Sequence, residues 1–148
     1  MVPDAPSGCS SAPFPRGTVV TKQVINTPDA PAAIGPYSQA VAVDNLLFTA
    51  GQIALDPKTM QVVPGDVAAQ AEQVMLNLAA ICVAAGATLQ DVVKTTVFLQ
   101  EMSDFQAMNE VYARHFGANR PARSTVAVRG LPRYVRVEIE AIVRLPNA

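Results

Sequence analysis

The chain has one histidine, two cysteines and no tryptophan among its 148 residues. A single histidine argues against catalytic histidine pairs, and so few histidines and cysteines argue against a zinc site. Two cysteines are also too few for a disulfide framework. There is no glycine-rich loop to hold phosphates, and no apolar run approaches the length of a membrane span. The net charge of −1 supplies no strong field for nucleic acid or anionic membranes.

The rare residues that are present fit structural roles. Cys82 lies in a helical pattern and is expected to be a small buried hydrophobe, whereas Cys9 lies in an irregular N-terminal stretch. His115 ends a predicted helix, where an imidazole is favourable beside the last carbonyls. These positions indicate no metal and no thiol chemistry.

Half of the residues are hydrophobic, which is enough for one domain with a proper core. Residues 1–17 hold four of the twelve prolines and show no periodicity, so we expect a flexible extension. This segment has no apolar signal-peptide centre and one arginine, which favours a cytoplasmic protein, with mitochondrial import as the alternative. A single domain is expected over residues 18–148.

The first half of that domain reads as strands. Residues 18–25 favour a strand, and residues 39–43 and 46–50 favour a hairpin around Asp44 and Asn45. Both turn residues tolerate the positive φ that a tight turn needs.

Two helices follow, separated by a β-branched strand at 92–99. Asp66 is the predicted N-cap of the first helix, which ends at Gly86. Ser103 is the predicted N-cap of the second helix, which ends at Gly117. The inward positions are apolar at helical spacing: Ala71, Val74, Met75, Leu78, Ile81, Cys82 and Ala85, then Phe105, Met108, Val111, Tyr112 and Phe116.

The chain closes with a strand that carries Arg123, a Gly-Leu-Pro turn, and a strand over 135–144 that alternates strictly. This order predicts an α+β domain in which two helices pack on one face of a mixed sheet. The other face is then left for neighbouring subunits to cover. In the last strand one face is apolar and the other is charged: Val135, Val137, Ile139, Ala141 and Val143 against Arg136, Glu138, Glu140 and Arg144.

Arg123 is a charged residue in an otherwise apolar or hydroxyl strand. Its planar fork of donors matches a carboxylate, whereas an edge-strand arginine can equally extend to solvent. The local pattern leaves both readings open.

Several separated segments resemble the RidA (Rid/YjgF) family of enamine and imine deaminases, also called the L-PSP endoribonuclease family. They are APAAIGPYSQAV at 30–41, FTAGQIALDP at 48–57, DVVKTTVFL at 91–99, FQAMNEVYARHF at 105–116, and PARSTVAV with VEIEAI at 121–142. The resemblance implies a chorismate-mutase-like homotrimer with clefts between subunits and no cofactor. It also implies hydrolysis of 2-iminobutanoate and 2-iminopropanoate to 2-oxoacids and ammonia.

The resemblance assigns the catalytic roles to two charged residues. Arg123 matches the arginine that binds the substrate carboxylate, and Glu138 matches the carboxylate that positions a water. Tyr37 matches an aromatic residue of the cleft.

Other positions match by resemblance as well. The main-chain groups of Gly51 and Thr125 fall where the family contacts substrate, and Asn109 matches a residue near the cleft, although a helix position equally favours a structural hydrogen bond. Ala50 stands where many members have serine, and Thr125 where some have cysteine.

Two other functions stay open from the sequence. Some relatives are described as endoribonucleases or translation inhibitors, against which the near-neutral charge and the lone His115 argue. A non-catalytic trimer that binds a small carboxylate would use the same cleft.

Overall fold

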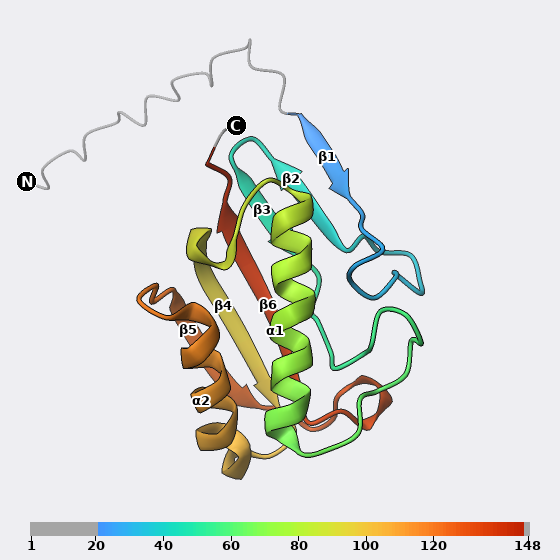
Figure 1. Ribbon diagram of the computed structural model, residues 1–148, viewed down its shortest axis with the longest axis vertical. Coiled ribbons are helices and arrows are strands. Elements are labelled where there is room, and N and C mark those ends of the chain that lie inside the picture. Colours follow the sequence, from blue (N-terminus) through green and yellow to red (C-terminus); the bar gives the residue numbers. More distant parts are fainter. Residues whose placement is uncertain (1–20, 147–148) are drawn as a thin grey trace, which may run out of the picture.

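A computed structural model describes residues 21–146, in which two helices lie on one face of a six-stranded sheet (Figure 1). The sheet order is β1-β2-β3-β6-β4-β5, and every neighbouring pair is antiparallel except β4 and β5. The elements are β1 (Lys22–Ile25), β2 (Ala40–Val43), β3 (Leu46–Thr49), α1 (Val67–Ala84), β4 (Val92–Leu99), α2 (Phe105–Phe116), β5 (Ala122–Ala127) and β6 (Val137–Arg144). The predicted α+β class and the two-helix layer are confirmed.

The hairpin of β2 and β3 forms as expected. Asp44 has a φ of 53° at its turn, which is the left-handed conformation that Asp tolerates. The first strand begins at Lys22, and the predicted extension at 1–17 lies outside the described residues.

Helix α1 begins where the sequence places it. The Asp66 carboxylate accepts a hydrogen bond from the Ala69 amide at 3.0 Å, and Gly86 follows the helix with a φ of 83°. By length and composition this helix could cross a membrane, contrary to the expectation that no such run exists. In the structure its apolar face packs on α2 and β6. The apolar composition of α1 is therefore that of a core helix.

Ser103 is not the N-cap of α2. It lies inside a short 3-10 turn, Met102–Asp104, so the helix begins one residue later than a Ser103 cap would place it, at Phe105. Asp104 then takes the N-cap position without capping, because its carboxylate accepts two hydrogen bonds from Arg136, from Nε at 2.9 Å and from Nη2 at 2.8 Å. Gly117, with a φ of 58°, ends the helix as predicted.

The alternation in β6 sorts its residues between core and open face. Val137, Ile139 and Val143 are completely buried on the helix side, so Glu138 projects from the opposite side. Within residues 21–146 no helix covers that opposite side (Figure 1). Phe48 and Val126 are exposed there. The sheet therefore presents one partly apolar face for another surface to cover.

Cys82 and His115 have structural roles. Cys82 is completely buried, and burial raises the pKa of its thiol to about 12, so it is inert as a nucleophile. His115 lies in the last turn of α2, and its Nε2 is 2.8 Å from Glu72 Oε2 on α1. The imidazole thus links the two helices.

Candidate active site

All but one of the residues implied by the resemblance line two separate clefts. The acidic cleft, of about 460 Å³, contains Tyr37, Gly51 and Glu138, together with Pro31, Ala32, Ile34, Gln39, Ala50, Gln52, Ile53, Leu55, Pro132 and Arg133. The arginine cleft, of about 480 Å³, contains Asn109 and Arg123, together with Tyr112, Ala113, Phe116, Gly117, Asn119, Arg120 and Pro121. Thr125 lines neither cleft, and its buried hydroxyl has no hydrogen-bond partner among residues 21–146.

The carboxylate of Glu138 lies against Gly51. A Cβ atom on Gly51 would overlap the Glu138 carboxylate, so only glycine leaves room for it there. Gly51 is held in place because its neighbour Gln52 and Ile139 exchange two backbone hydrogen bonds, of 2.8 and 3.1 Å. Partial burial raises the pKa of Glu138, and the nearby charge of Glu140 adds to the shift. The site therefore holds a carboxyl group that gains a proton more readily than an ordinary glutamate.

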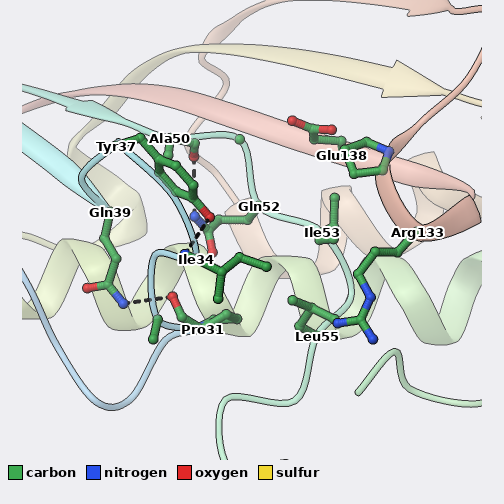
Figure 2. A pocket seen from close by; sticks show the side chains of 13 residues that line it. Pro31, Ile34, Tyr37, Gln39, Ala50, Gln52, Ile53, Leu55, Arg133 and Glu138 are labelled. Atoms are coloured by element: carbon green, nitrogen blue, oxygen red, sulfur yellow. Dashed lines mark hydrogen bonds between the residues drawn. The ribbon is translucent and has the colours of Figure 1, made fainter. Parts of the chain in front are cut away.

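Tyr37 forms one wall of the acidic cleft and is half exposed, at 53%. Its hydroxyl accepts a hydrogen bond from the Ile34 amide at 3.4 Å (Figure 2). The loop that carries both residues is fastened by Gln39, whose side-chain amide donates to the carbonyls of Pro31 and Ala30 at 2.8 and 3.1 Å. Sequence reasoning missed Gln39, which lies just before β2, although a glutamine at the start of a predicted apolar strand is a signal of such a tie.

The floor of the acidic cleft is apolar. Asn77, buried on α1, donates to the carbonyls of Ile53 and Leu55 at 3.2 and 3.0 Å and so fixes this floor. The side chain of Arg133 runs past Leu55, at the opposite end of the cleft from Tyr37 (Figure 2). Sequence reasoning missed all of these residues, and the only available signal was the polar Asn77 within an apolar helical stripe.

Arg133 belongs to a strained turn. Its φ is 54° and that of the adjacent Tyr134 is 58°, in a conformation that bulky residues rarely adopt. Arg133 Nη1 donates to the Met60 carbonyl at 2.8 Å, which ties this turn to the neighbouring loop. The Tyr134 ring is 98% exposed.

Arg123 is held in the arginine cleft by neutral partners. Its guanidinium carbon lies 4.7 Å from the centre of the Tyr112 ring and 5.4 Å from that of Phe105. Arg123 Nη1 donates to Asn109 Oδ1 at 2.7 Å. Among residues 21–146, Nε and Nη2 have no hydrogen-bond partner, so part of the donor fork is open to an anion.

Tyr112 remains a neutral phenol in this cleft. Burial raises the pKa of Tyr112, while its 2.7 Å hydrogen bond with the Thr95 hydroxyl and the charge of Arg123 oppose the shift. The ring therefore serves as an uncharged platform for the guanidinium.

Arg123 and Glu138 project from opposite faces of the sheet. Arg123 contacts α2 on the helix side, whereas Glu138 lies on the open side. One of the other three charges on the Glu138 side of the sequence pattern, Arg136, pairs with Asp104. Within residues 21–146 no ion pair reaches Glu138, so a structural ion pair does not account for this carboxylate.

Residues 21–146 contain no group of three His, Cys, Asp or Glu side chains that could hold a metal ion. The chemistry available in the two clefts is that of carboxylate, guanidinium, amide and aromatic groups.

Comparisons with known proteins cover nearly the whole described region. The family model for Endoribonuclease L-PSP matches residues 27–145. A mouse (Mus musculus) protein named 2-iminobutanoate/2-iminopropanoate deaminase is 51% identical over 123 residues, which cover 83% of this chain and 91% of the mouse protein.

Solved structures agree in fold. The chain matches the RidA structure from an Antarctic Psychrobacter bacterium with a TM-score of 0.80 and 49% identity, covering 83% of this chain and 99% of that one. It matches Escherichia coli TdcF with bound serine with a TM-score of 0.79 and 44% identity, covering 82% and 98%.

Proposed function

The chain belongs to the Endoribonuclease L-PSP family, the family of RidA, and on this premise we propose that it hydrolyses 2-iminobutanoate and 2-iminopropanoate to 2-oxoacids and ammonia. The mouse relative bears the name of this activity at 51% identity. The observation that carries the proposal is the pair of clefts, one with a carboxyl group of raised pKa and the other with an open guanidinium fork.

Arg123 binds the substrate carboxylate. Its open Nε and Nη2 form the planar fork that a carboxylate matches, and Asn109 with Tyr112 holds the guanidinium in place. A charge-assisted hydrogen bond of this kind contributes about 1.5–3 kcal/mol. The bound serine in TdcF shows that a relative takes a small amino acid.

Glu138 positions the water that attacks the imine carbon. The carboxylate accepts a proton from this water as the C–O bond forms, and it returns the proton to the nitrogen. The hydroxyl of the intermediate then gives its remaining proton to Glu138 as the C–N bond breaks, so that the oxo group forms and ammonia leaves. The protonated Glu138 finally releases this proton to solvent. The raised pKa of Glu138 suits this residue both to accept and to donate a proton. A general acid–base group works best when its pKa lies near the working pH. A positioned acid–base group of this kind contributes about 10²–10⁴-fold in rate.

The remaining residues shape the site around the substrate. The Tyr37 ring packs on the substrate, and the main-chain groups of Gly51 and Thr125 contact it. Ala50 lines the same cleft and offers no hydroxyl. A protonated imine is itself electrophilic, so the proposed reaction uses no cofactor.

The complete site lies between two subunits of a homotrimer. Since Arg123 and Glu138 project from opposite faces of one chain's sheet, one substrate meets both only when they come from different copies. The open sheet face, with Phe48 and Val126 exposed, supplies apolar surface for that assembly. We place the protein in the cytoplasm, with mitochondria as the alternative.

The two other functions have weaker support. RNA cleavage by acid–base catalysis would require its groups in a cleft, but His115 bonds to Glu72 and lines neither of the two clefts. A carboxylate-binding trimer without turnover would need Arg123 and would make the raised pKa of Glu138 incidental.

The test is a coupled assay. Purified protein is added to a threonine or serine dehydratase reaction, and the rate of 2-oxoacid release is followed. We expect the wild-type protein to accelerate release and Glu138→Gln to lose that acceleration while it still binds a 2-oxoacid. Binding without acceleration by the wild-type protein would favour the carboxylate-binding trimer instead.

A further inference from the structure

The arginine cleft is lined by a second arginine, the exposed Arg120, three residues before Arg123. The other side chains and glycine of the lining are aromatic, small or amide-bearing, and none is a carboxylate. Two arginines and no carboxylate therefore line one cleft of about 480 Å³.

Two other arginines of the chain are paired with carboxylates. Arg136 makes a two-point contact with Asp104, and Arg114 lies 3.9 Å from Glu72. Among residues 21–146, neither Arg120 nor Arg123 has a carboxylate partner, and of the five described arginines without one, these are the two that line the same cleft. The positive charge of the arginine cleft therefore has no counter-ion within the described residues of its own chain.

The backbone that carries Arg120 is fixed. The Asn119 side chain donates to the carbonyls of Leu89 and Val92 at 3.0 and 3.1 Å, and the Asn119 amide donates to Phe116. On the other side, Pro121 restricts the chain by its ring. The Cα atoms of Arg120 and Arg123 can be at most about 10 Å apart, because only two residues lie between them. The long side chain of Arg120 can thus reach a small ligand that is bound to Arg123.

We propose that Arg120 binds a second acidic group, so that the site accepts 2-imino and 2-oxo dicarboxylic acids of four or five carbons. The proposal rests on the proposed function, in which Arg123 binds the carboxylate next to the imine carbon. Arg120 then takes the carboxylate at the far end of the chain and determines specificity for dianionic substrates.

The test uses two stable probes of equal length, 2-oxopentanedioate and 2-oxopentanoate, which differ only in the far carboxylate. Isothermal titration calorimetry on the whole assembled protein gives both affinities. We expect the dicarboxylate to bind about tenfold more tightly, as one charge-assisted contact implies. Raising the salt concentration should reduce this difference, because an exposed guanidinium is screened.

Arg120→Gln should remove the preference for the dicarboxylate and leave the monocarboxylate affinity within about twofold. Arg114→Gln is the matched control, since it removes the same charge from an exposed arginine outside the cleft and should keep the preference. Equal binding of both probes by the wild-type protein, or a preference that survives Arg120→Gln, would overturn the proposal.

The two proposals fail in different ways. If the protein does not hydrolyse imines, the probe affinities can still be measured, because binding needs no turnover. An Arg120-dependent preference without any hydrolysis would therefore support the dicarboxylate site alone, and hydrolysis without that preference would support the deaminase alone.

Discussion

The two clefts have nearly the same volume and opposite chemistry. The acidic cleft places Glu138 above an apolar floor with Arg133 at one end, whereas Arg120 and Arg123 line the arginine cleft among aromatic and amide side chains, with no carboxylate. A carboxyl group and a guanidinium thus lie on different sides of one sheet. Under the proposed function, each chain carries two complementary half-sites.

The clefts also differ in how they are held. Loops form much of the acidic cleft, and the buried amides of Gln39 and Asn77 fasten them. Regular elements form most of the arginine cleft, since Arg123 lies on β5 and its partners Asn109 and Tyr112 on α2. Small backbone changes should therefore disturb the acidic half more readily than the arginine half.

The largest effect is expected from mixing chains that each lack one half-site. Arg123→Ala and Glu138→Gln should each lower hydrolysis by at least about 100-fold. After dissociation and reassembly of an equimolar mixture, about a quarter of the wild-type turnover should return, because random cyclic assembly joins an intact Arg123 to an intact Glu138 at that fraction of interfaces.

The control for this experiment is the same mixture without dissociation, which should stay inactive. Light scattering must show the same assembly for both variants. If reassembly restores nothing, the two residues act within one chain and the half-site comparison is wrong.

Arg123→Lys tests whether the arginine cleft works through its planar fork. Lysine keeps the charge but offers a single point of contact, so affinity for 2-oxobutanoate should fall about 10–100-fold. Calorimetric titration measures this, with Arg114→Lys as the control at an exposed position. Near-normal affinity would mean that charge alone, and not the fork, binds the carboxylate.

Gly51→Ala tests the close approach in the acidic cleft. The new methyl group would displace the Glu138 carboxylate, and turnover should fall about tenfold or more, as expected when a catalytic group is misplaced. Steady-state kinetics give the result. Gly130→Ala is the matched control, because a methyl group there meets nothing within 4 Å and should leave turnover unchanged. Equal rates for both variants would show that Glu138 needs no fixed position.

The smallest effect concerns stability. Because the pKa of Glu138 is raised in the folded protein, ionisation of this carboxyl opposes folding as pH rises through that pKa, and has no effect below the ordinary value. Glu138→Gln should therefore melt at the same temperature as the wild-type protein near pH 4 and at a slightly higher temperature at pH 8. Differential scanning calorimetry at both values checks this, with the exposed Glu110→Gln as control. A lower melting temperature at pH 8 would indicate a stabilising role for the carboxylate.

Much of the fold could be predicted because local rules act directly on the elements concerned. Asp66, Gly86 and Gly117 set helix ends through their own side chains or φ angles. Ser103 failed as a cap because a tertiary contact decided the outcome. Arg136, distant in sequence, takes the Asp104 carboxylate, and a 3-10 turn precedes the helix.

The site was less predictable than the fold. Alternation in β6 placed Glu138 on the face away from the core, and this was correct. The same reasoning could not orient Arg123, because no residue of the edge strand β5 is fully buried and alternation there has no buried face to mark. Hydrogen bonds such as those of Gln39 with Pro31 and Asn77 with Leu55 join residues 8 and 22 positions apart in the sequence and have no periodic signal.

The central position of α1 has a consequence for protein synthesis. Residues 67–84 leave the ribosome before the strand they pack against, since β6 begins only at Val137. At usual translation rates the interval is roughly 3–10 s, during which an apolar helix has no completed sheet to cover it. A ribosome that stalls in this interval would release a chain whose helix α1 exposes apolar surface and lacks the strand that would bury it. This helix is therefore the segment that we expect nascent-chain chaperones to bind.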